Sequence, residues 1–166
     1  MAQVSIEYII MVPVLILQIF LFPLTAAWIM NTWVDSRQTI ALRETASHLG
    51  SSMQQVYSSI NHDTISAGVV KVTLDIPPFI ESYSYMGNAT LRTAITSDPN
   101  SSRVLEITLR LVGTSISTTT LVTFGQNFEW QNSTLTSNST DSSTAPSIYA
   151  NKTQDGVIRM RFPIIG

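Results

Sequence analysis

The side chains that most often perform catalysis or bind metal ions are few and scattered in this chain. The two histidines, His48 and His62, stand at no recognisable spacing from a carboxylate and a nucleophile. The absence of cysteine excludes disulfides and thiolate chemistry. Asp63, Asp75 and Asp98 are too isolated to form a calcium loop, and no glycine-rich phosphate loop occurs. We therefore expect no enzymatic activity, no cofactor and no metal site.

The most informative single residue is an acid, Glu7, at the edge of a long apolar segment. After Glu7, no Asp, Glu, Lys or Arg occurs before Asp35. An acid placed near a membrane is costly, so its presence is by default a hint of function. The alternative is that Glu7 sits at the membrane interface near a helix N-terminus, where the helix dipole favours a carboxylate.

The second half of the chain contains candidate sites for N-glycosylation. Residues 82–153 are rich in Ser, Thr and Asn, and the N-x-[ST] pattern of N-glycosylation occurs five times, at Asn88, Asn100, Asn132, Asn138 and Asn151. Some would arise by chance in such a composition. Their clustering, with none in the apolar half, favours a glycosylated outer surface.

The apolar segment is long enough to cross a membrane. Residues 8–30 are 23 uncharged residues, mostly Ile, Leu, Val, Phe and Met, and a helix of about 20 such residues spans a bilayer. A secretory signal peptide would have a basic start and a shorter apolar core. Pro13 and Pro23 lie inside the segment and predict helix kinks, which either assist packing or have no role.

The residues around Glu7 resemble a known family. Gln3-Val4-Ser5-Ile6-Glu7-Tyr8 is similar to the Q-x-S-x-E-Y start of archaeal type IV pilins with a class III signal peptide. Glu7-Tyr8 followed by Pro13 also resembles the E-[FY]-x4-P pattern of TadE-like minor pilins. Both resemblances cover only about the first 35 residues, and the rest of the chain matches no motif that we can name.

The resemblance implies a polymerising subunit. A prepilin peptidase would cut between Ala2 and Gln3, and an assembly ATPase and membrane platform would move the helix from the membrane into an extracellular filament. Glu7 would then pair with the N-terminal amine of a neighbouring subunit and fix its register, because a buried unpaired charge is strongly disfavoured. The partners would be other copies of the chain, the membrane before assembly, and N-glycans.

The helical pattern continues beyond the apolar segment. Thr45 and Ala46 fill the gap in a stripe at helical spacing made of Val34, Ala41, Leu42, Leu49, Met53, Val56 and Ile60. Polar residues such as Arg37 and Glu44 fall on the opposite face. We expect a hydrophobic helix over residues 1–34, an amphipathic continuation over 35–62, and a stop near Asn61 and Gly68.

The remainder, residues 66–166, reads as a β-rich head. Residues 70–76, 105–111 and 158–162 alternate apolar and polar side chains, and weaker strands are predicted at 82–85, 91–96, 115–124 and 127–130. Residues 131–147 are a low-complexity loop. The predicted fold class is α+β: a long N-terminal helix followed by an antiparallel β-sandwich-like head, as in type IV pilins.

Two classes of function follow from these patterns. The first is the major subunit of an extracellular type IV-like pilus that serves adhesion or cell contact. The second is a minor TadE-like pilin, or a single-span surface protein that stays in the membrane. Nucleic acid is excluded as a partner, because the net charge is −2 and the nine basic residues form no cluster in the sequence.

Overall fold

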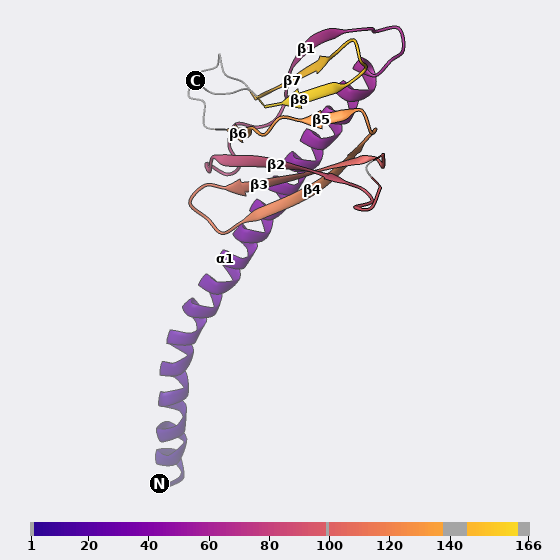
Figure 1. The fold of residues 1–166 in the computed structure, drawn as a ribbon. Coiled ribbons are helices and arrows are strands. Elements are labelled where there is room, and N and C mark those ends of the chain that lie inside the picture. The colour runs from indigo at the N-terminus through magenta and orange to yellow at the C-terminus, as the bar shows by residue number, and fades with distance from the viewer. Residues whose placement is uncertain (1, 99, 138–145, 163–166) are drawn as a thin grey trace. The chain divides into compact units, whose positions relative to one another are not determined.

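The chain begins with one long helix. A computed structural model describes residues 2–98, 100–137 and 146–162, with side chains from residue 8 onward. Helix α1 (Ala2–Ile60) contains both Pro13 and Pro23 and continues through them without a break (Figure 1). It ends where the amide of Asn61 donates the last helical hydrogen bond to the carbonyl of Tyr57 (2.8 Å). The chain divides into two compact units, residues 1–37 and 38–166.

The second unit contains two four-stranded sheets. One sheet has the order β1 (Gly68–Thr73), β7 (Ser147–Lys152), β8 (Ile158–Arg161) and β5 (Phe128–Trp130). The other has the order β4 (Ser117–Phe124), β3 (Arg103–Leu111), β2 (Tyr85–Thr93) and β6 (Thr134–Thr136). With a long apolar helix before these sheets, the fold is of the α+β class.

The pairing is antiparallel with one exception, which corrects the expectation of a wholly antiparallel head. Strand β5 runs parallel to β8, with Phe128 opposite Ile158 and Trp130 opposite Met160. The reason lies in the connection. The chain leaves the second sheet at the end of β4, turns at Gly125, and enters the first sheet from there rather than through a hairpin with β8.

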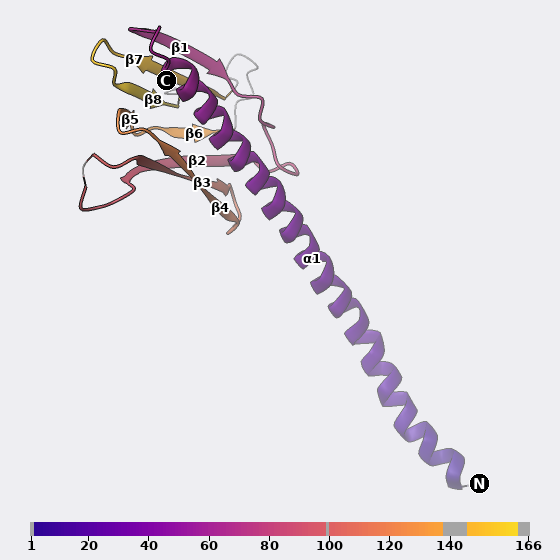
Figure 2. The same ribbon diagram turned by 90° about the vertical axis from the view of Figure 1, so that its right-hand side faces the viewer.

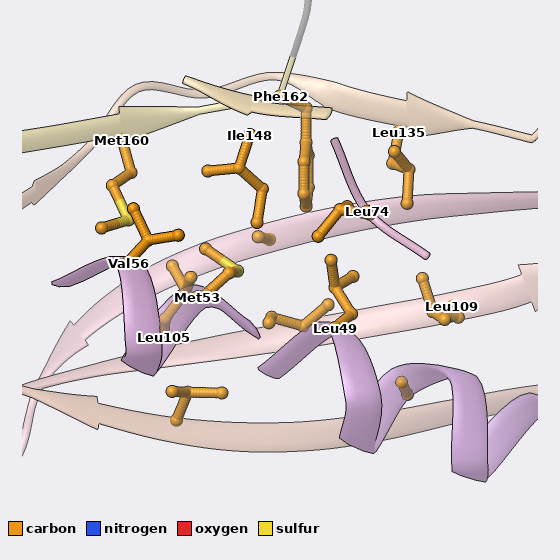
Figure 3. Packing of buried hydrophobic residues seen from close by; sticks show 14 of the residues in the cluster. Leu49, Met53, Val56, Leu74, Leu105, Leu109, Leu135, Ile148, Met160 and Phe162 are labelled. Carbon is orange, nitrogen blue, oxygen red and sulfur yellow. The ribbon is translucent and has the colours of Figure 1, made fainter. Parts of the chain in front are cut away.

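The second unit is built around one hydrophobic core. Alternate residues of β2, β3, β7 and β8 are buried, as the period of a strand requires. Figure 3 shows Leu49, Met53 and Val56 of the helix among side chains from both sheets. Figure 2 shows this half of α1 running along one side of the strands. The predicted stripe is buried from Leu42 to Ile60, Thr45 and Ala46 included, and every buried hydrophobic side chain of the described residues lies between Leu42 and Phe162.

Several predicted strand boundaries were wrong. No strand covers 82–85: Glu81 and Ser82 have positive φ angles of 47° and 76°, which turn the chain, and β2 starts only at Tyr85. Strand β6 lies inside the stretch that we expected to be a loop, 131–147, and β7 begins at its end. Strand β6 is short and polar, and its backbone partner β2 is distant in sequence, so local alternation did not reveal it. Strand β7 contains apolar residues, but it follows directly on the low-complexity stretch, and its partner β1 is distant in sequence.

A set of polar and aromatic contacts holds the C-terminal end of the helix to the sheets. The Tyr57 hydroxyl donates to Asn127 Oδ1 (2.6 Å) and accepts from the Gly125 amide (3.1 Å). Its ring packs edge-on against Phe124 and Phe128, with ring centroids 5.2 and 6.0 Å away. Because these partners are about 70 residues away in sequence, they fix the helix end to both sheets.

Candidate functional site: the apolar surface of the N-terminal helix

The first unit exposes almost every large apolar side chain that the structure describes in it. Between Tyr8 and Val34, nineteen large hydrophobic side chains are exposed, with fractions from 37% for Val34 to 76% for Phe22. The helix is hydrophobic on all sides, so no polar face is available to water. Helices of this kind are stable only in lipid or against other apolar surfaces.

A groove lies along one side of this helix. It has a volume of about 550 Å³ and is lined only by apolar residues. These recur at helical spacing as Pro13, Ile16, Leu17, Phe20, Leu21 and Leu24. The ring of Pro13 leaves the carbonyl of Ile9 without its helical donor, because proline has no amide hydrogen. The groove has an apolar lining that suits apolar side chains from another helix.

Two polar side chains within this segment bond to the helix itself. The hydroxyl of Thr25 donates to the carbonyls of Leu21 (3.0 Å) and Phe22 (2.9 Å), one turn before it. Thr32 donates to the carbonyl of Trp28 in the same way, at 2.9 Å. Such back-bonding hides the hydroxyl from the surroundings. The surface presented to a partner or to lipid is therefore mostly apolar, with the exposed amides of Gln18 and Asn31 as exceptions.

The end of the apolar surface is marked by aromatic and charged residues. Trp28 and Trp33 are 70% and 59% exposed, and the guanidinium of Arg37 lies 4.9 Å from the Trp33 ring. Tryptophan gathers at the interface between membrane and water. Helix α1 is long and apolar enough to cross a membrane. Signal sequences near an N-terminus meet the same criterion of length and composition. The segment can thus serve as a membrane anchor.

The predicted peptidase and register residues lie at the start of α1. Ala2, Gln3 and Glu7 belong to its backbone, but their side chains lie outside the described residues. The roles predicted for them therefore stay predictions. Pro13 and Pro23 are inside the helix, and Pro13 lines the groove.

Four of the five predicted glycosylation residues are described, and all four are exposed. Asn88 lies in β2, Asn151 lies in β7, and Asn132 follows β5. Asn100 lies in a turn, where its backbone amide donates to Asp98 Oδ1. Asn138 lies outside the described residues. Of the four described sequon residues, the two that lie in strands, Asn88 and Asn151, belong to different sheets and are not paired by the register.

The two histidines lie apart. His48 is exposed on the helix, and His62 follows the helix end, where its Nδ1 lies 2.9 Å from the Thr64 hydroxyl. Within the described ranges, no three His, Asp or Glu side chains come close enough to hold a metal ion.

Sequence reasoning missed two polar residues on inner faces. Gln38 is only 4% exposed at the start of the second unit, and Lys152 is 8% exposed on β7. Lys152 Nζ donates to the carbonyl of His62 (3.1 Å), near the end of the helix. Its aliphatic stem covers core atoms while the ammonium satisfies a backbone group. The apolar residues around Lys152 in β7 are the only local signal that was available.

Comparisons of the chain with protein-family models, curated proteins and solved structures find no match.

Proposed function

We propose that this chain is a structural subunit of an extracellular type IV-like pilus that polymerises through residues 8–34 of α1. One observation carries the proposal. The head keeps its buried hydrophobic side chains within residues 42–162, whereas the first unit leaves nineteen large ones uncovered. Apolar surface that the chain cannot cover by itself must be covered by lipid or by other chains.

Assembly of a pilus covers this apolar surface at each stage, first with lipid and then with other chains. Before assembly the helix lies in the membrane. In the filament, the groove beside Pro13 takes apolar side chains from the helix of a second copy. Covering one Leu or Ile side chain contributes roughly 1.5–3 kcal/mol, so several such contacts per subunit suffice for a durable fibre. Glu7 sets the register by pairing with the N-terminal amine of a neighbour that begins at Gln3.

The remaining parts fit an outer surface. The head presents Ser-, Thr- and Asn-rich faces to solvent, and at least two of its sequons carry N-glycans. The filament serves adhesion or cell contact, and the head is the part of each subunit that touches the surface to which the cell attaches.

A second candidate function is supported by the resemblance of Glu7-Tyr8 and Pro13 to TadE-like pilins, and by the ability of α1 to cross a membrane. In that case the chain is a minor pilin or a single-span surface protein. Shearing filaments from the producing cells and analysing them by electron microscopy and mass spectrometry separates the two. A major pilin dominates the sheared fraction and starts at Gln3. A chain found only in the membrane fraction contradicts the first proposal and supports the second.

A further inference from the structure

The outer face of the first sheet brings together basic side chains from β1 and β8 with an aromatic and an amide side chain from β7. The register places Lys71 of β1 directly opposite Tyr149 of β7, and Tyr149 directly opposite Arg161 of β8. Residues directly opposite across neighbouring strands point to the same face of a sheet. In the next row, Asn151 of β7 is paired with Arg159 of β8. These residues are distant in sequence, and the sheet makes them neighbours.

Both cations of the first row lie against the tyrosine ring. Lys71 Nζ is 5.4 Å from the centroid of the Tyr149 ring, and Arg161 Cζ is 5.6 Å from it. Among the described residues, no carboxylate forms an ion pair with Lys71 or Arg161. Arg159, in contrast, is held by Glu129, with 2.7 Å between Nε and Oε2. Lys71 and Arg161 therefore have N–H donors that no carboxylate of the described residues occupies, and the neighbouring Arg159 is held in place by Glu129.

A groove runs over four of these residues, and Lys71 lies beside it rather than in its lining. It has a volume of about 320 Å³, and most of its lining is polar. Tyr149, Asn151, Arg159 and Arg161 line it, together with Gln131 from the segment after β5. A volume above 300 Å³ is within the range of small-ligand sites in proteins. The groove thus combines an aromatic ring, amide groups and positive charge in a chain whose net charge is −2.

We propose that this groove binds an acidic polysaccharide. Lys71 and Arg161 contact the carboxylates of two sugar residues, because their strands are two spacings apart, about 10 Å. The Tyr149 ring contacts the apolar face of a sugar ring. Asn151, Gln131 and the Arg159 guanidinium donate to sugar hydroxyls, and Arg161 can hold a carboxylate in a bidentate pair.

The chemistry favours a sugar over other polyanions. A nucleic acid needs a longer track of cations to neutralise its phosphates. An acidic peptide would use the cations, and its backbone could bond to the amides of Asn151 and Gln131, but a run of acidic side chains presents no apolar ring face to Tyr149. A chain of uronic acids matches all three features: spaced carboxylates, abundant hydroxyls and apolar ring faces.

The proposal has a consequence for Asn151. A glycan attached to its amide nitrogen would fill the groove, so the two uses exclude each other. We therefore infer that Asn151 stays unmodified in the native protein, while the other exposed sequons are free to carry glycans.

The test measures binding of polygalacturonate to the full-length protein in nonionic detergent by titration calorimetry. Lys71→Gln/Arg161→Gln should bind it at least about a hundredfold more weakly, because it loses two charge-assisted hydrogen bonds and each contributes at least about tenfold in affinity. The control, Arg43→Gln/Arg110→Gln, removes the same charge from exposed positions outside this sheet and should bind as the wild type does. Tyr149→Phe should retain affinity, and Tyr149→Leu should lose it. Circular dichroism verifies the fold of each variant.

Three results would overturn the proposal. The first is equal weakening by both double variants, which would mean nonspecific charge attraction. The second is binding of poly-L-glutamate or a DNA oligonucleotide as tightly as polygalacturonate, which would mean that the sugar rings are not recognised. The third is a glycan found on Asn151 by peptide mass spectrometry of the native protein. Neutral dextran should not bind.

Discussion

Removal of residues 1–37 should convert a chain that needs detergent or a filament into a soluble, monomeric β-rich protein. The cut coincides with the boundary between the two units. All buried hydrophobic side chains of the described residues, including those contributed by the retained half of α1 from Leu42 to Ile60, lie on the retained side. The truncated chain therefore keeps its core.

The size of the expected effect follows from the exposed apolar surface. At the lower value of about 1.5 kcal/mol per fully covered large side chain, nineteen exposed residues amount to an order of 30 kcal/mol. Even half of this sum, about 14 kcal/mol, is as large as the upper part of the 5–15 kcal/mol that stabilise a typical folded domain. The intact chain should therefore assemble or enter detergent micelles, whereas the truncated chain has no comparable drive.

Sedimentation velocity in detergent-free buffer measures the outcome. The truncated protein should give one monomeric boundary, and its circular dichroism should show strand together with some helix. Leu49→Asp in the same background is the control for folding: it puts a carboxylate into the core and should unfold the protein. Ordered filaments from the truncated chain would refute the reasoning, because the head and not the helix would then be the polymerising element.

Four further outcomes are expected. Glu7→Ala and Glu7→Gln should lower the number of filaments seen by electron microscopy while the precursor still reaches the membrane; normal numbers from the alanine variant would remove the register role. The intact mass of the native protein should exceed 18.3 kDa by discrete sugar increments, and the bare mass would exclude glycosylation. Tyr57→Phe should lower the free energy of unfolding of the head by about 1–2 kcal/mol in urea titrations, since Gly125 and Asn127 lose their partner; an unchanged midpoint would contradict this. Burial raises the pKa of the Tyr85 hydroxyl from 10.0 to about 12. The contribution of this protonated hydroxyl to folding stability is therefore complete below pH 10 and is lost as the pH rises through 12. Tyr85→Phe should flatten the plot of unfolding free energy against pH in this range, and identical plots for wild type and variant would contradict the prediction.

The sequence by itself was sufficient for the helix and for the type of fold. The uncharged and mostly apolar run from Tyr8 onward and the stripe from Leu42 to Ile60 are local signals, and a helix is built from local hydrogen bonds. The strongest alternations predicted β3 and β8 for the same reason. Glu7 and the sequons could also be named from sequence, because a motif needs no partner from elsewhere in the chain.

Only the tertiary structure decided which distant residues meet. Strand β6 depends on β2, far along the chain, because a short polar strand has no stability of its own, and β7 lies between the adjacent β8 and the distant β1. The parallel pairing of β5 with β8 is a matter of chain direction, which alternation does not encode. Lys71, Tyr149 and Arg161 become one row only through the register of three strands. Local pattern reports which face a side chain takes, but the cross-strand hydrogen bonds alone determine which neighbour it has.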